Sequence, residues 1–129
     1  MATSTITATI GLSGPGMTSQ SLAVGRATTL VIDSPTIESG AKVVPGTVST
    51  GFTTLIDGTA IGATGGYVYI KNTEPTTAAT VDIFHGGVAA GSLKPGEWAF
   101  FPTIATEVIK VNSKLGPDTT CEFGFWTAA

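Results

Sequence analysis

Short β-type runs separated by turn residues dominate the second half of the chain. They recur at roughly 8–12-residue intervals, a spacing typical of β-sandwiches and barrels. No long stretch shows a helical period. We predict strands at Tyr67–Asn72, Thr80–His85, Val88–Leu93, Glu97–Thr103, Thr106–Val111 and Thr120–Thr127. The sequence therefore predicts an all-β fold, an antiparallel β-sandwich or a jelly-roll-like domain.

The first half also favours strands, with more glycine and proline between them. Residues Thr5–Leu12 alternate strictly between threonine or glycine and an apolar side chain, which is the pattern of a half-exposed strand. Further strands are expected at Ala27–Asp33, Ala41–Val44 and Thr47–Ile56, and Asp57-Gly58 has the composition of a hairpin turn. No linker divides the chain, so residues 1–129 are expected to form a single domain.

Residues 1–25 contain no charged side chain. An ordinary first strand of the domain is the simpler interpretation. The alternative is an extended N-terminal arm that adds a strand to a partner. The apolar side chains expected to touch that partner are Ile6, Ile10, Leu12, Met17 and Leu22.

The low charge of the chain restricts its partners. Only 12% of the residues are charged, about half of the usual ~25%, and the net charge is −3. The six basic residues are scattered, which argues against a nucleic-acid partner. A surface with few charges suits a subunit that is packed among others.

The sequence shows no membrane segment and no secretion signal. No apolar run approaches the ~18 residues that a membrane helix needs. Met1–Leu12 lacks the basic start and continuous apolar core of a signal peptide, so synthesis and folding in a cytoplasm are expected. One cysteine allows no intrachain disulfide.

The chemically reactive residues do not form a recognisable site. His85 and Cys121 are the only histidine and the only cysteine, and neither has a suitable neighbour in the sequence. His85-Gly86-Gly87 resembles an esterase oxyanion loop, but the matching G-x-S-x-G motif is missing. We read His85 as a strand-end residue and Cys121 as a small core residue. The carboxylates at 33, 38, 57, 82, 97 and 122 are each isolated. We therefore predict no catalytic residues, no cofactor, no metal and no enzyme activity.

Aromatic residues are concentrated after residue 66. Alternation places Trp98 with Phe100 on one face of a strand, and Phe123 with Phe125 on one face of another. We expect the aromatic residues, together with Val68, Ile70, Val81 and Ile83, to form the core between two sheets. A second hypothesis is that Tyr67, Tyr69 and Trp98, with Trp126, form a platform for a sugar ring.

The segment from Tyr67 to Trp126 resembles small β-rich structural proteins of tailed bacteriophages. The resemblance lies in Tyr67–Thr73 (YVYIKNT), Leu93–Pro102 (LKPGEWAFFP) and Glu122–Trp126 (EFGFW). It covers a little under half of the chain and implies a virion component. Capsid decoration (cement) proteins have this size and commonly sit as trimers on the lattice of the major capsid protein. Tail and adaptor proteins share the pattern.

These observations lead to a ranked set of functional hypotheses. The first is a capsid decoration protein on the virion surface, with the major capsid protein and further copies of itself, as a homotrimer, for partners. The second is a tail, fibre or adaptor subunit. The third is a carbohydrate-binding module for host-surface glycans. The first 66 residues carry no resemblance that would separate these hypotheses.

Overall fold

Strands make up the whole regular structure of the described chain. The computed structural model describes residues 4–12, 24–32, 38–44, 52–57, 64–75, 80–114 and 118–128. The strands are β1 (Ser4–Leu12), β2 (Val24–Ile32), β3 (Glu38–Val44), β4 (Thr53–Ile56), β5 (Gly66–Asn72), β6 (Thr80–His85), β7 (Val88–Leu93), β8 (Trp98–Thr103), β9 (Ile109–Lys114) and β10 (Thr119–Thr127). Within these ranges no helix is long and apolar enough to cross a bilayer.

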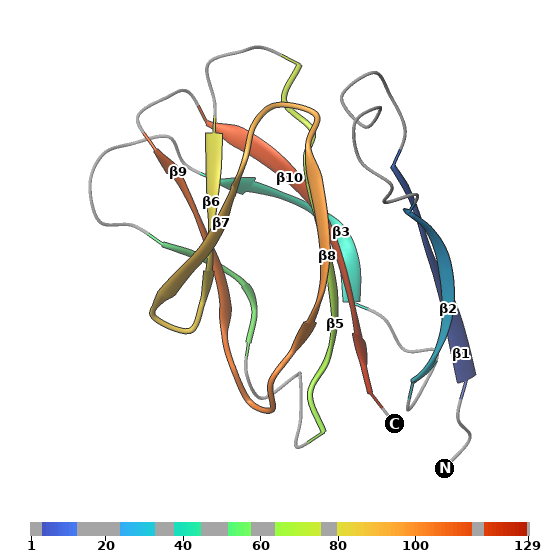
Figure 1. The fold of residues 1–129 in the computed structure, drawn as a ribbon. Coiled ribbons are helices and arrows are strands. Elements are labelled where there is room, and N and C mark those ends of the chain that lie inside the picture. Colours follow the sequence, from blue (N-terminus) through green and yellow to red (C-terminus); the bar gives the residue numbers. More distant parts are fainter. Residues whose placement is uncertain are drawn as a thin grey trace.

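Two four-stranded antiparallel sheets face each other across the core (Figure 1). Sheet I has the order β3-β10-β5-β8, and sheet II has the order β4-β9-β6-β7. This arrangement is that of an eight-stranded jelly roll. The predicted fold class, an antiparallel β-sandwich or jelly roll, is therefore confirmed.

The first two strands form a separate hairpin. β1 pairs with β2 along its whole length, from Ser4 opposite Ile32 to Leu12 opposite Val24. A bridge between Ile32 and Ala128 joins this hairpin to the end of β10. Figure 1 shows the hairpin on the side of sheet I that faces away from sheet II. β1 is thus a strand, as predicted, but it belongs to neither of the two large sheets.

Most predicted strands occur close to their expected bounds. β6 and β7 begin and end where the sequence places them, on either side of Gly86-Gly87. β9 begins at Ile109, later than the predicted Thr106, because Thr106 adopts a φ of 59° that is incompatible with a strand. β4 covers only the end of the predicted strand Thr47–Ile56, whose residues 47–51 lie outside the described chain. Gly58 of the expected hairpin turn lies outside it as well.

Alternation correctly predicted the inward side chains of three strands. Val68 and Ile70 of β5, Val81 and Ile83 of β6, and Phe123 and Phe125 of β10 are all buried. The core is completed by Val44, Leu55, Ile56, Leu93, Ile109, Val111 and Cys121. It lies between the two sheets and is built mainly from branched aliphatic side chains.

The expected burial of Trp98 was wrong, and so was the inward orientation of Phe100. Trp98 is 51% exposed, and the side chains of β8 packed against the core are Ala99 and Phe101. The reason is the register of β8 on β5, which places Ala99 opposite Ile70 and Phe101 opposite Val68. Directly opposed residues share a face of the sheet, so Ala99 and Phe101 point inward with their partners.

The turn between β7 and β8 is centred on Pro95-Gly96. Gly96 adopts a φ of 83°, and the Glu97 N–H donates to the Lys94 carbonyl at 3.0 Å. Both features are those of a type II turn with proline and glycine at its centre. This turn carries the chain from sheet II to sheet I.

Asn72 fastens this crossing to the end of β5. Its side chain is fully buried; Nδ2 donates to the Leu93 carbonyl at 3.1 Å and Oδ1 accepts from the Glu74 N–H at 3.0 Å. Its backbone N–H donates to the Glu97 carbonyl, and its carbonyl accepts from the Gly96 N–H. A buried amide with these partners costs little, because its polar atoms are satisfied.

Replacement of Asn72 by alanine should lower the free energy of unfolding by about 2–4 kcal/mol, because it leaves the Leu93 carbonyl and the Glu74 N–H without a partner. Urea unfolding measures this change. The matched control is Asn112→Ala, since Asn112 is a half-buried asparagine on β9. Its loss should stay within about 0.5–1 kcal/mol. Equal losses in the two variants would contradict the role assigned to Asn72.

Candidate functional site

The outward surface of sheet I carries a group of aromatic side chains, which we call the aromatic face: Tyr67, Tyr69, Trp98, Phe100 and Trp126. On β5 the strand period explains it directly. Val68 and Ile70 are fully buried, so Tyr67 and Tyr69 between them point outward and are half-buried. The expectation that Tyr67 and Tyr69 belong to the core between the two sheets was therefore wrong.

Strand register brings the other aromatic residues onto the same face. Tyr69 lies opposite Phe100 of β8, and Tyr67 lies opposite Trp126 of β10. Trp98 lies opposite Lys71, one outward position further along β5. Three strands that are distant in sequence thus contribute to one surface.

Ring packing fixes the shape of the aromatic face. The rings of Tyr67 and Phe100 are nearly parallel, at 6° with centroids 6.2 Å apart, and Phe100 and Trp126 meet at 54° and 6.4 Å. The Trp126 indole lies over Gly124, where a Cβ atom would come within 3.3 Å of the ring. Glycine at position 124 therefore leaves room for the indole to lie close to the sheet.

Polar groups lie within and beside the aromatic face. The Tyr69 hydroxyl donates to Glu122 Oε1 at 3.1 Å. Partial burial raises the pKa of Tyr69, and the hydrogen bond and negative charge of Glu122 raise it further. The Trp126 Nε1 atom is buried and has no hydrogen-bond partner among the described residues. Lys71 lies opposite Glu122, so one base and one acid border the rings.

The residues expected to touch a partner from the N-terminal arm are only partly placed. Ile6, Ile10 and Leu12 belong to β1, but their side chains are outside what the structure describes. Met17 and Leu22 lie outside the described residues altogether. Whether these five residues contact a partner stays a prediction.

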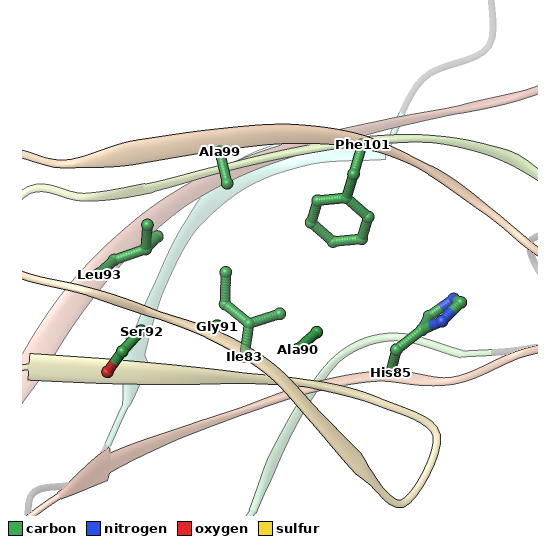
Figure 2. A pocket seen from close by; sticks show the side chains of 8 residues that line it. All are labelled: Ile83, His85, Ala90, Gly91, Ser92, Leu93, Ala99 and Phe101. Atoms are coloured by element: carbon green, nitrogen blue, oxygen red, sulfur yellow. The ribbon is translucent and has the colours of Figure 1, made fainter.

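A second surface feature is an apolar groove where the edges of the two sheets meet. It has a volume of about 340 Å³ and lies between β6 and β7 of sheet II and β8 of sheet I (Figure 2). We call it the β7–β8 groove. Its lining is Ile83, His85, Ala90, Gly91, Ser92, Leu93, Ala99 and Phe101. Small side chains at positions 90, 91 and 99 leave this space unfilled.

His85 lies at one end of the groove, at the end of β6 and next to the Gly86-Gly87 turn, as predicted. Its ring packs edge-on against Phe101, with centroids 6.3 Å apart. The Nε2 atom is buried and makes no hydrogen bond to any described residue. Figure 2 shows the ring beside the apolar lining, with no second titratable side chain among the labelled residues.

The carboxylates and the thiol are placed separately from His85. Asp82 accepts from the Ser92 hydroxyl, Glu97 accepts from the Lys94 N–H, and Glu122 accepts from Tyr69. Asp33 lies outside the described residues. In the described part of the chain, no three histidine, cysteine or carboxylate side chains gather as a metal site would require. Cys121 is a buried core residue, as predicted.

Sequence reasoning missed two parts of these surfaces. Phe100 was assigned to the core, and the β7–β8 groove was not foreseen. The position of Ala99 between two aromatic residues was the available signal that Phe100 faces outward. A small side chain that faces the core is compatible with bulky neighbours that face outward. The groove had no local signal, because it forms only where Ala90 and Gly91 of β7 meet Ala99 of β8 in the other sheet.

Comparison of the sequence with protein-family models found no match, and comparison with curated proteins found none either. The aromatic face and the β7–β8 groove therefore have to be interpreted from their own geometry and chemistry.

The Cys121 thiol should be inert in the folded protein, because burial raises its pKa to about 11. A thiol reagent at pH 8 should label it slowly in buffer and rapidly in urea. An exposed thiol deprotonates near pH 8.5, so folding binds this proton more tightly. The contribution of this bound proton to the free energy of unfolding is fully present below about pH 8.5 and is lost as the pH rises through about 11. Rapid labelling of the native protein would contradict this burial.

Proposed function

We propose that the protein is a structural subunit of a tailed-phage particle, most like a capsid decoration protein that binds across subunits of the major capsid protein. In this proposal the protein resides on the capsid surface of the virion after synthesis in the host cytoplasm. It acts by burying surface against its partners, and it carries out no reaction. The observation that supports it most is the aromatic face of sheet I.

The composition of the aromatic face suits a protein interface. Tryptophan and tyrosine are enriched among the residues that contribute most binding energy, and they lose little conformational entropy on binding. Trp98 is 51% exposed, while its neighbours are held by stacked rings and by the bond from Tyr69 to Glu122. A partner would therefore meet a largely preorganised surface, which lowers the entropic cost of association.

Two further observations support a role in a particle. The segment Tyr67–Trp126, which resembles phage structural proteins, includes the aromatic face and the turn before β8. Jelly rolls also occur in viral capsid domains, although this fold hosts other functions too. A subunit that binds only the assembled lattice stabilises that lattice by mass action. Further copies of the chain, as in a trimer, would multiply this effect.

A tail, fibre or adaptor subunit is the alternative position within the same class. The aromatic face suits any large protein partner, so the position on the particle requires direct observation. Negative-stain images of particles that carry a tagged copy separate the two. Label on the head supports the decoration proposal, whereas label confined to the tail replaces it with the alternative.

Glycan binding is the second candidate function, and specific geometry favours it. The nearly parallel rings of Tyr67 and Phe100 and the exposed Trp98 present flat apolar surfaces, on which the C–H face of a sugar can pack. Lectin domains are also found among jelly rolls. This surface has the same aromatic residues as the proposed protein interface, so the two functions need separate measurements.

Truncation of Trp98 to alanine should weaken attachment to capsids about 30-fold, as expected for loss of about 2 kcal/mol at an interface hot spot. Occupancy on purified particles over a range of protein concentrations measures the change. Phe52→Ala is the matched control, because Phe52 is an aromatic residue with 49% exposure on the side of sheet II. Equal occupancy of wild type and Trp98→Ala would rule out this use of the aromatic face.

If the glycan hypothesis holds, Tyr67→Ala and Trp98→Ala should each abolish binding on a glycan array, while Phe52→Ala should retain it. The test does not require the target sugar to be known in advance, since an array of host-surface glycans screens many ring stereochemistries together. Absence of wild-type binding to every glycan would reject the hypothesis. Circular dichroism of each variant verifies that the fold is intact.

A further inference from the structure

Within the described chain, four strands lie at the edges of sheets I and II, and three of them carry features that hinder edge-to-edge pairing. β3 contains Glu38 and Lys42, and β8 contains Pro102. β4 spans four residues and has an irregular register on β9. Charges, proline, shortness and irregularity are the usual protections of an edge strand. β7 has the sequence VAAGSL, with no charge and no proline.

The residues of β7 are exposed along nearly the whole length of the strand. Every residue from Val88 to Ser92 is exposed, and Val88 is 71% exposed. β6 pairs with one side of β7, and within sheet II no described strand pairs with the other. The register shifts between Ile83 and Phe84, so that Ala90 is the extra residue of a bulge and lines the groove. The residues on either side of the bulge present an uncharged edge.

The β7–β8 groove defines what kind of strand could be added. A strand paired with β7 would project every second side chain toward the groove and the others toward solvent. The groove is lined by Ile83, Leu93, Ala99 and Phe101, so apolar side chains fit on its side. The added strand should therefore alternate apolar with small polar residues and carry no charge.

β1 of this same chain has these properties. Ile6, Ala8, Ile10 and Leu12 alternate with threonine and glycine, and the strand is uncharged. Among the described strands it pairs with β2 alone, and a two-stranded ribbon is marginal by itself in water. Since neither β1 nor β7 carries a charged residue, pairing them would not desolvate any charged group of these strands. About six interchain backbone hydrogen bonds would form along β7, compared with about ten hydrogen bonds in a typical protein interface. The groove would in addition bury side chains of the added strand.

The partner strand has to come from another copy. Figure 1 shows β1 and β2 beyond sheet I, whereas β7 belongs to sheet II on the opposite layer. We propose that β7 of one copy pairs with β1 of a second copy, so that sheet II continues into the neighbour's β1–β2 hairpin and apolar side chains of β1 enter the β7–β8 groove. The two surfaces differ, so the contact is head-to-tail and generates a closed ring or a filament. This inference goes beyond the proposed function and does not depend on it.

Light scattering of the full-length protein over a concentration series tests the pairing. Wild type should form oligomers, and Val88→Lys and Ala90→Lys should each weaken them by more than about tenfold, since each places a charge on the edge or in the groove. Val43→Lys is the matched control, because Val43 is also an exposed valine, 56% accessible, on the edge strand β3. A monomeric wild type, or equal effects of Val88→Lys and Val43→Lys, would overturn the inference.

Disulfide trapping identifies the strands in contact. Copies with Thr7→Cys or Thr9→Cys are mixed with copies carrying Ala89→Cys and oxidised; buried Cys121 should not interfere. Mixed dimers should form in larger yield than with Val43→Cys in place of Ala89→Cys. Equal yields would overturn the pairing of β1 with β7. Particle attachment is measured separately: oligomers that do not bind particles would contradict the proposed function alone, and attached monomers would contradict this inference alone.

Discussion

The buried side chain of Asn72 fixes the turn between β7 and β8. Both the aromatic face and the β7–β8 groove depend on this turn. The Asn72 side chain joins the end of β5 to Leu93, where β7 ends, and the Asn72 backbone binds Gly96 and Glu97, where β8 is about to begin. Because these bonds set where β8 starts along β5, they also set which residues of β8 face outward. A buried amide is favourable only when its partners are all in place, so the arrangement is specific as well as stable. The register of sheet I is therefore set by a buried polar contact beside a mainly apolar core.

β8 contributes to two surfaces at once. Its outward residues, Trp98 and Phe100, complete the aromatic face, and its inward residues, Ala99 and Phe101, form one wall of the β7–β8 groove. A shift of one residue in its pairing would exchange the two sets and destroy both features. The two surfaces also differ in kind. The aromatic face is broad and rigid and suits a flat partner, whereas the groove is narrow and bordered by an open strand, which suits an extended one.

Local pattern predicted most strands but not the surfaces. Alternation identified Val68 and Ile70 as core residues, and Gly86-Gly87 separated β6 from β7 correctly. For β8 the same alternation showed that Trp98 and Phe100 share a face, yet it could not say whether that face is inside. That choice depends on the pairing of Ala99 with Ile70, a contact between strands distant in sequence. Predicting the groove would also have required knowledge of the bulge at Ala90 and of the place where the edges of the two sheets meet. The separate β1–β2 hairpin was likewise invisible to local pattern, since an alternating strand looks alike in any sheet.

The strand order also has a kinetic consequence. Within the two four-stranded sheets, β6 and β7 are the only described strands that are both consecutive in the chain and paired with each other. Every other pairing in sheets I and II joins segments separated by at least one intervening strand, such as β3 with β10. Proteins dominated by such distant contacts have a high contact order and fold in milliseconds to seconds, because loop closure precedes most of the stabilisation. The β6–β7 hairpin is then the natural early element, and the C-terminal strand β10 has to be synthesised before sheet I can close. Sheet I is therefore expected to form only after β10 has been synthesised.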